Sequence, residues 1–259
     1  IFNKKNFYLP ENGTPSTHII KPNIEGYKDT VFNELFCMKL AKACGLSTPE
    51  CFIKTIKDKN FYVVERYDRE KNNGLWTRIH QEDFCQILNV LPENKYESDG
   101  GPNLVSCFEL LDKIKVPAPS KIAFIDLVIF NYLIGNGDAH AKNFSILYKN
   151  DIPNLAPCYD LMCTAIMAPY YDKHRMAMKL CASKYYMSRV KRENFEKLSE
   201  ISGYRTDFIL KRLASLSAKI LTKANELADI LNSSADTQSD VYSVIIKIIE
   251  KHVFMIQKN

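Results

Sequence analysis

Four polar side chains crowd into six residues of the segment 133–147, LIGNGDAHAKNFSIL, directly after an apolar run. They are Asp138, His140, Lys142 and Asn143. Transfer of a phosphoryl group from ATP needs an acid that accepts the proton of the acceptor hydroxyl, and it needs oxygen ligands for Mg²⁺. Asp138 and Asn143, spaced D-x-x-x-x-N, supply both groups. The segment therefore predicts a loop for phosphoryl transfer, with Asp138 as the base.

Other residues in the chain extend this set in the order found in kinases. Asp160, in APCYDLMCT, corresponds to the metal-binding acid that follows the catalytic loop. Lys21 ends the strand-like THIIK, where a kinase places the lysine for the α/β-phosphates, and Glu34 stands on the next helix as its partner. The segment VERYD, 64–68, lies where an adenine-binding hinge is expected. Taken singly, Asp160 is typical of a turn, Glu34 of a solvated helix face and His140 of a hydrogen-bonded loop; the order of the set carries the prediction.

The elements that must position these residues are read from apolar periodicity and turn residues. Before residue 68 we expect strands at 6–10, 17–23, 50–56 and 60–67, and a helix that begins at Asp29 or Thr30 and ends at Gly45. After a polar loop at 69–78, helices are predicted at 80–90, 103–114, 120–135, 192–202, 206–232 and 236–257. Less regular chain at 145–181 includes strand-like pieces at 144–148 and 176–180. The prediction is an α+β, protein-kinase-like fold with a small mixed N-lobe (1–68) and a large all-helical C-lobe (69–259).

Composition limits the class of protein. With 259 residues and 46% hydrophobic residues the chain can build a sizeable core, and its net charge of +5 comes without a dense Lys/Arg run that would indicate a nucleic-acid binder. No uncharged apolar stretch approaches ~18 residues, so no membrane span is expected. Since no secretory leader or CxxC pair is found, we expect a cytoplasmic protein whose reduced cysteines pack in the core: Cys37, Cys44, Cys51, Cys85, Cys107, Cys158, Cys163 and Cys181. The start at Ile1 rather than Met indicates a processed chain or a fragment.

Seven segments together resemble the HipA family of serine/threonine kinase toxins, over about residues 16–200: STHIIKP, NELFCMKLAKACGL, VERYDR, HQEDFCQ, KYESDGGP, LIGNGDAHAKNFSIL and APCYDLM. The resemblance implies a kinase-like fold that uses ATP and Mg²⁺. It also implies the toxin of a type II toxin–antitoxin pair, whose antitoxin is a small helix-turn-helix protein that contacts DNA. The implied substrate is a protein, and in well-studied relatives it is an aminoacyl-tRNA synthetase.

The resemblance also assigns roles by motif. It implies Asp138 as catalytic base, Asn143 and Asp160 as metal ligands, Lys21 as the phosphate contact, Glu65 and Tyr67 as adenine-binding residues, and His140, Lys142 and Tyr159 as further nucleotide-site residues. The family's glycine-rich loop, which carries an autophosphorylated regulatory Ser, would fall before Ile1. The family's extra N-terminal subdomain is likewise absent, as in the short HipT form, where such a subdomain is a separate polypeptide.

Two other functions remain open. Antibiotic and choline kinases use a similar GD-x-x-x-x-N loop, so a small-molecule phosphotransferase is one alternative; KYESDGGP and HQEDFCQ favour the HipA pattern. The other is a catalytically dead scaffold that serves as a corepressor. Retention of Lys21, Asp138, Asn143 and Asp160 argues against it, because a scaffold has no need of four converging polar groups.

Overall fold

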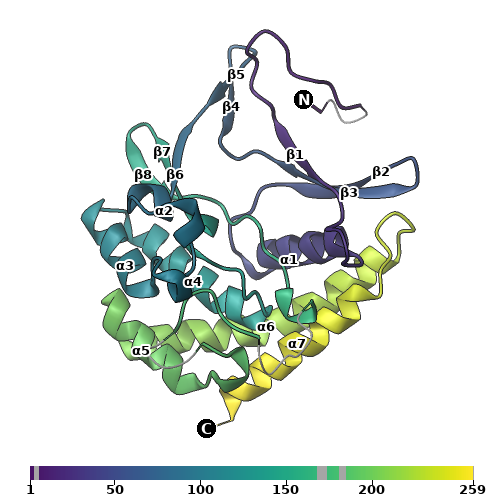
Figure 1. Cartoon of the computed structure of the whole chain (residues 1–259). Coiled ribbons are helices and arrows are strands. Elements are labelled where there is room, and N and C mark those ends of the chain that lie inside the picture. Colours follow the sequence, from purple (N-terminus) through teal and green to yellow (C-terminus); the bar gives the residue numbers. More distant parts are fainter. Residues whose placement is uncertain (3–5, 168–173, 181–184, 259) are drawn as a thin grey trace.

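The computed structural model describes residues 1–2, 6–167, 174–180 and 185–258 of the chain. Near its N-terminal end a three-stranded antiparallel sheet, in the order β1-β3-β2, lies over one long helix (Figure 1). The strands are β1 (His18–Lys21), β2 (Cys51–Ile56) and β3 (Lys59–Glu65), and the helix is α1 (Thr30–Cys44). These elements match the predicted ones, except that residues 6–10 form no strand and make only an isolated bridge at Phe7.

The register of the sheet determines where Lys21 points. β2 and β3 are joined by Lys57 and Asp58, both with positive φ (48° and 61°), as a two-residue hairpin turn of right-handed twist requires. In β1, Lys21 pairs with Tyr62 of β3. Paired residues on neighbouring strands share a face, and the Lys21 ammonium accordingly lies 5.9 Å from the centre of the Tyr62 ring.

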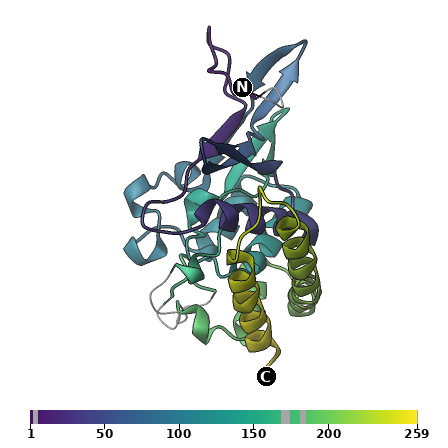
Figure 2. The same cartoon turned by 90° about the vertical axis from the view of Figure 1, so that its right-hand side faces the viewer.

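Helix α1 is buried nearly all round. Twelve of its 15 residues are buried, because the sheet covers one side and helices α6 (Thr206–Asn232) and α7 (Val241–Gln257) cover another (Figures 1 and 2). A helix that is apolar on most sides belongs in a core. It ends at Gly45, whose left-handed backbone (φ 97°) lets its N–H bond the Lys42 carbonyl.

The chain after Asp68 is mostly helical but also carries two small sheets. The predicted polar loop 69–78 is a hairpin of β4 (Arg69–Asn72) and β5 (Leu75–Arg78). The predicted helix 80–90 begins instead as strand β6 (His80–Asp83) and continues as the single turn α2 (Phe84–Ile87). β6 is a strand because it pairs with β7 (Ser145–Lys149), which in turn pairs with β8 (Ile152–Leu155). The C-lobe is therefore not all-helical.

The long helices agree with the predicted periodicity. They are α3 (Leu104–Lys113), α4 (Ala118–Leu133), α5 (Arg192–Ser202), α6 and α7. α7 begins five residues later than predicted, and the predicted strand-like piece 176–180 is irregular. Helices α5 and α6 pack against each other, and α4 contacts α6 and α7. Among the described residues, no helix is both long and apolar enough to cross a bilayer.

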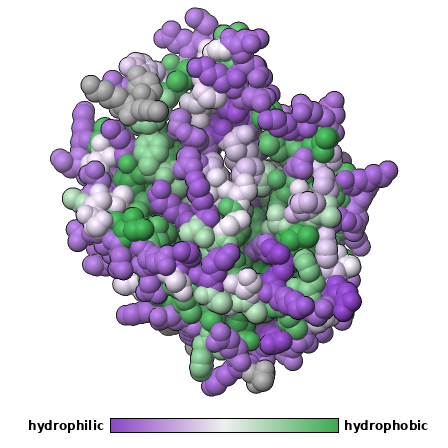
Figure 3. All heavy atoms as spheres, turned by 180° about the vertical axis from the view of Figure 1, so that it is seen from behind, coloured by the Kyte–Doolittle hydropathy of each residue, from purple (hydrophilic) through white to green (hydrophobic). Residues whose placement is uncertain are grey.

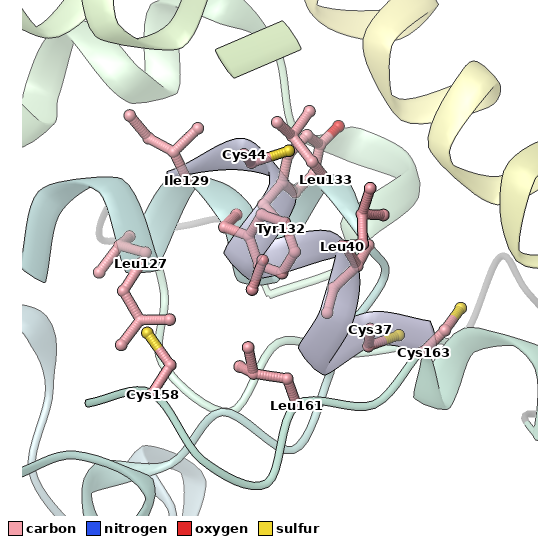
Figure 4. Packing of buried hydrophobic residues seen from close by; sticks show 14 of the residues in the cluster. Cys37, Leu40, Cys44, Leu127, Ile129, Tyr132, Leu133, Cys158, Leu161 and Cys163 are labelled. Atoms are coloured by element: carbon pink, nitrogen blue, oxygen red, sulfur yellow. The ribbon is translucent and has the colours of Figure 1, made fainter. Parts of the chain in front are cut away.

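The core joins α1 to the middle of the chain. Figure 4 shows Leu40 and Cys44 of α1 next to Tyr132 and Leu133 of α4, with Cys158 and Leu161 below them and Cys163 beside Cys37. In the described residues seven cysteines are free and buried, as predicted; Cys181 lies outside them. The face seen from behind in Figure 3 carries hydrophilic residues around its edge, with hydrophobic ones interspersed.

Candidate active site

Three charged side chains far apart in sequence meet beneath the β1-β3-β2 sheet. The Lys21 ammonium donates to Glu34 Oε1 at 2.8 Å and to Asp160 Oδ1 at 2.7 Å. Burial raises the pKa of Glu34 to about 7, against the opposing effect of Lys21. Burial lowers the pKa of Lys21, but the two carboxylates outweigh it and the net shift is upward. Lys21 therefore stays cationic between the α1 helix and the segment that contains Asp160.

Asp160 is held in an uncommon backbone conformation. Its φ is +57°, in the left-handed region that Asp and Asn enter more readily than other non-glycine residues. Cys163 lies three residues after Asp160, and the buried Asn33 side chain pairs with both of its backbone groups. Its Nδ2 donates to the Cys163 carbonyl at 3.0 Å, and its Oδ1 accepts from the Cys163 N–H at 2.8 Å. Because Asn33 precedes Glu34, this pair fixes Asp160 relative to α1.

Replacing Asn33 with Ala is expected to lower the free energy of unfolding by about 2–6 kcal/mol. The Asn33 side chain is 1% exposed, so its loss leaves two buried backbone groups of Cys163 without partners, at about 1–3 kcal/mol each. Urea denaturation measures the change. Asn225→Ala is the matched control, because Asn225 also donates to a backbone carbonyl, that of Leu221, but is exposed. Equal losses in the two variants would contradict the structural role of Asn33.

The predicted catalytic loop leaves α4 through a tight turn. At Gly137 a Cβ atom would come within 2.4 Å of the Arg175 carbonyl oxygen, so only glycine fits there. The Asp138 N–H donates to Asn136 Oδ1 at 3.0 Å, and Asn143 Nδ2 donates to the Asp138 carbonyl at 2.8 Å. The loop thus closes on itself over the D-x-x-x-x-N spacing, which brings Asn143 next to Asp138.

His140 lies behind the Asp138 carboxylate rather than in the solvent. It is 4% exposed, with its Nε2 3.8 Å from Asp138 Oδ1. Burial lowers the pKa of His140, although Asp138 acts in the opposite direction, so the imidazole is neutral at pH 7. A neutral imidazole contributes packing to the loop and no positive charge.

A cleft of about 310 Å³ opens between the β1-β3-β2 sheet and the loop. Its lining includes six of the predicted nucleotide residues: Lys21, Glu65, Tyr67, Lys142, Tyr159 and Asp160. The Tyr67 and Tyr159 rings stack with centres 5.8 Å apart, and the Tyr159 hydroxyl donates to the Lys142 carbonyl at 2.8 Å. The Lys142 ammonium donates to Asp83 at 2.7 Å. Asp138, His140 and Asn143 are not among the lining residues.

A second cavity of about 480 Å³ adjoins the first at Asp160. Its walls include Asp138 and Tyr96, with Ile24 and Met162 among its apolar residues. The two cavities share Asp160.

The donors present fit a magnesium ion bound with phosphates. Asp160 has a side chain 42% exposed, and Asn143 uses its amide nitrogen on the loop, which leaves its oxygen available for a metal. In the described part of the chain, no group of three or more His, Cys, Asp or Glu is placed to hold a metal by itself. Mg²⁺ at phosphoryl-transfer sites takes only one or two protein carboxylates and completes its shell with phosphates and water.

Among the site residues that were not predicted are Asn33, Tyr96 and Asp83. Asn33 and Tyr96 were inside recognised segments, NELFCMKLAKACGL and KYESDGGP, but their partners are distant in sequence. Asp83 had a local signal, because Asp83 and Gln86 form a capping box at the start of α2.

Comparisons with known proteins agree with the family resemblance found in the sequence. The profile of the HipA-like C-terminal domain family matches residues 3–238. The protein Y4mE of Sinorhizobium fredii, named as a kinase, is 38% identical over 90% of this chain. The serine/threonine-protein kinase toxin HipA of Shewanella oneidensis is 30% identical over 68% of it.

Solved structures show the same fold. Shewanella oneidensis HipA, determined in a complex with HipB and operator DNA, superposes with a TM-score of 0.89 over 99% of this chain at 23% identity. The Helicobacter pylori kinase CtkA gives 0.61 over 92% at 15% identity. The chain spans 54% of Y4mE and 62% of the HipA chain. The fold is kinase-like, and the chain belongs to the HipA-like C-terminal domain family.

Proposed function

We propose that this chain is the kinase part of a serine/threonine protein kinase toxin, which transfers the γ-phosphoryl group of ATP to a protein hydroxyl. The observation that carries the proposal is the pair of adjoining cavities. One holds the Lys21–Glu34–Asp160 cluster, and the other holds Asp138, with Asp160 between them. An ATP-bound phosphate and an acceptor hydroxyl need this relation, because the chemistry consists mainly of positioning and charge neutralisation.

In this reaction each residue has one task. Lys21 holds the α/β-phosphates, and Glu65, Tyr67, Lys142 and Tyr159 surround the nucleoside. Bound Mg²⁺ would neutralise charge on the β- and γ-phosphates, with Asn143 and Asp160 as its protein ligands.

Asp138 orients the acceptor hydroxyl and takes its proton. His140 supports the Asp138 loop from behind, as its burial beside Asp138 indicates. Autophosphorylation of a Ser in a glycine-rich loop outside these 259 residues belongs to the same proposal.

The partner we propose is a helix-turn-helix antitoxin, through which alone the protein would meet DNA. Support comes from Shewanella oneidensis HipA, whose solved structure contains HipB and operator DNA. A small separate protein equivalent to the N-terminal subdomain is a second proposed partner. The net charge of +5 suits an enzyme that leaves DNA contact to a partner. We propose a cytoplasmic location and an aminoacyl-tRNA synthetase as target.

The test is phosphoproteomics after brief expression of the full-length protein. Cells that express the wild type are expected to show one dominant new phosphoserine or phosphothreonine site and to stop growing, because each phosphate adds nearly two negative charges to the target. Cells that express an Asp138→Asn variant at equal level should show neither change. Growth arrest by that variant would favour the scaffold function, and a phosphorylated small molecule without a protein site would favour a small-molecule phosphotransferase.

A further inference from the structure

Tyr96 of the segment KYESDGGP, residues 95–102, lines the second cavity, and the segment has no task in the mechanism above. We propose that Tyr96 is a positioning residue, which holds one oxygen of the Asp138 carboxylate and so directs the other toward the acceptor hydroxyl. This inference rests on the proposed phosphoryl transfer. It adds a residue that acts on the base itself.

The central contact is a hydrogen bond from the Tyr96 hydroxyl to Asp138 Oδ1. Partial burial, and next the hydrogen bond to Asp138, raise the pKa of the Tyr96 phenol, so it remains protonated and acts as the donor. A second neighbour of the carboxylate, the neutral His140 imidazole, also faces Oδ1, with its Nε2 3.8 Å away. In the described part of the chain, Asp138 Oδ2 takes part in no hydrogen bond or ion pair and is available to an acceptor.

The Tyr96 ring is itself fixed by its neighbours. It meets the ring of the buried His140 edge to face, with centres 5.0 Å apart and planes at 83°. The Lys95 ammonium lies 5.1 Å from its centre on another side. The backbone N–H of His140 donates to the Asp138 carbonyl at 2.8 Å. Tyr96, His140 and Asp138 therefore form one packed unit, in which the tyrosine ring cannot rotate without disturbing the histidine.

The rest of the motif holds the Tyr96 backbone. The Gly101 N–H donates to the Tyr96 carbonyl at 2.9 Å, and a Cβ on Gly101 would come within 2.0 Å of the Asn94 carbonyl oxygen. Glu97 accepts from the Lys179 backbone N–H at 2.7 Å and from its ammonium at 3.2 Å. The loop is thus closed at its glycine end and tied at Glu97 to the segment 174–180. These contacts account for the Tyr, Glu and second Gly of the motif.

The test compares Tyr96→Phe with the matched variant Tyr204→Phe. Tyr96→Phe keeps the ring on His140 and removes only the hydroxyl. The Tyr204 hydroxyl contacts the Ala118 carbonyl at 3.5 Å and lines neither cavity. With Mg·ATP and water as the acceptor, phosphate release gives kcat and KM. Tyr96→Phe is expected to lower kcat about 10- to 100-fold, as a misplaced reacting group does, with KM for ATP unchanged within about 2-fold. Tyr204→Phe should match the wild type.

A second measurement does not depend on catalysis. Hydrogen–deuterium exchange of residues 136–144 should be severalfold faster in Tyr96→Phe than in the wild type and in Tyr204→Phe, because the loop loses its side-chain anchor. Unchanged exchange together with unchanged kcat would overturn the inference, and so would a higher kcat, which would mean that the hydroxyl occupies the acceptor's place. If the wild type itself transfers no phosphate, the proposed function fails, and the exchange comparison alone then decides the role of Tyr96.

Discussion

Replacing Asp138 with Asn is expected to abolish phosphoryl transfer while nucleotide binding remains. The side chain lies outside the lining of the 310 Å³ cleft, so ATP keeps all of its proposed contacts. Asn retains an oxygen that accepts from Tyr96, and the Asn143 bond goes to the backbone at residue 138, so the loop should keep its shape. The lost functions are proton acceptance and negative charge. Removal of a general base costs on the order of 10²-fold or more in rate.

Transfer of labelled phosphate from γ-labelled ATP measures the rate, and calorimetry measures the affinity for nucleotide. The control is Asp207→Asn, which removes an exposed carboxylate near the start of α6, where it pairs with Arg205. It should leave both quantities unchanged. If Asp138→Asn transferred phosphate as fast as the wild type, Asp138 would not be the base.

A charge-removing change at Asp160 is expected to weaken Mg·ATP binding by about 10- to 100-fold, comparable to the loss of a metal-site interaction. Asp160→Asn is preferred to Asp160→Ala because φ at this position is +57°, where Asn is tolerated and Ala is strained. The substitution removes the negative charge of the proposed Mg²⁺ ligand and leaves Lys21 paired with Glu34.

The affinity for ATP without metal should change in the opposite direction or not at all. Lys21, Glu34 and Asp160 together carry one positive and up to two negative charges, and loss of one carboxylate reduces repulsion of the nucleotide phosphates. Calorimetry with Mg²⁺ and with a chelator separates the two cases. An identical loss in both conditions would show that Asp160 does not hold the metal.

Local patterns predicted most of the elements but few of the contacts between them. Helices α1, α4 and α6 were predicted because apolar residues at helical spacing lie within each segment itself. The β4–β5 hairpin was missed because its strands are polar, although Asn73-Gly74, both with positive φ, is a strong hairpin signal. Strand β6 could not be found locally, since its partner β7 is more than 60 residues away.

The residues of the candidate site likewise divide into those that local sequence predicts and those that distant contacts bring together. The spacing of Asp138 and Asn143 is local, and the loop closes over that spacing. The bond between Lys21 and Asp160 spans 139 residues, and only the resemblance to a known family connected them. Tyr96 could not be assigned to Asp138, because nothing in KYESDGGP encodes which distant carboxylate the hydroxyl reaches.

The burial of α1 limits how the proposed activity of this protein can be switched. Breaking the bond between Glu34 and Lys21 by rotating the helix outward would expose Leu35, Phe36 and Leu40, each fully buried. Burial of one such side chain stabilises the fold by about 1.5–3 kcal/mol, so the outward state would be rare at equilibrium. Swinging of this helix is therefore a costly route to inactivation here. Control is expected instead at the cleft mouth, through partners that block entry of nucleotide or acceptor, while the ion pair stays assembled throughout.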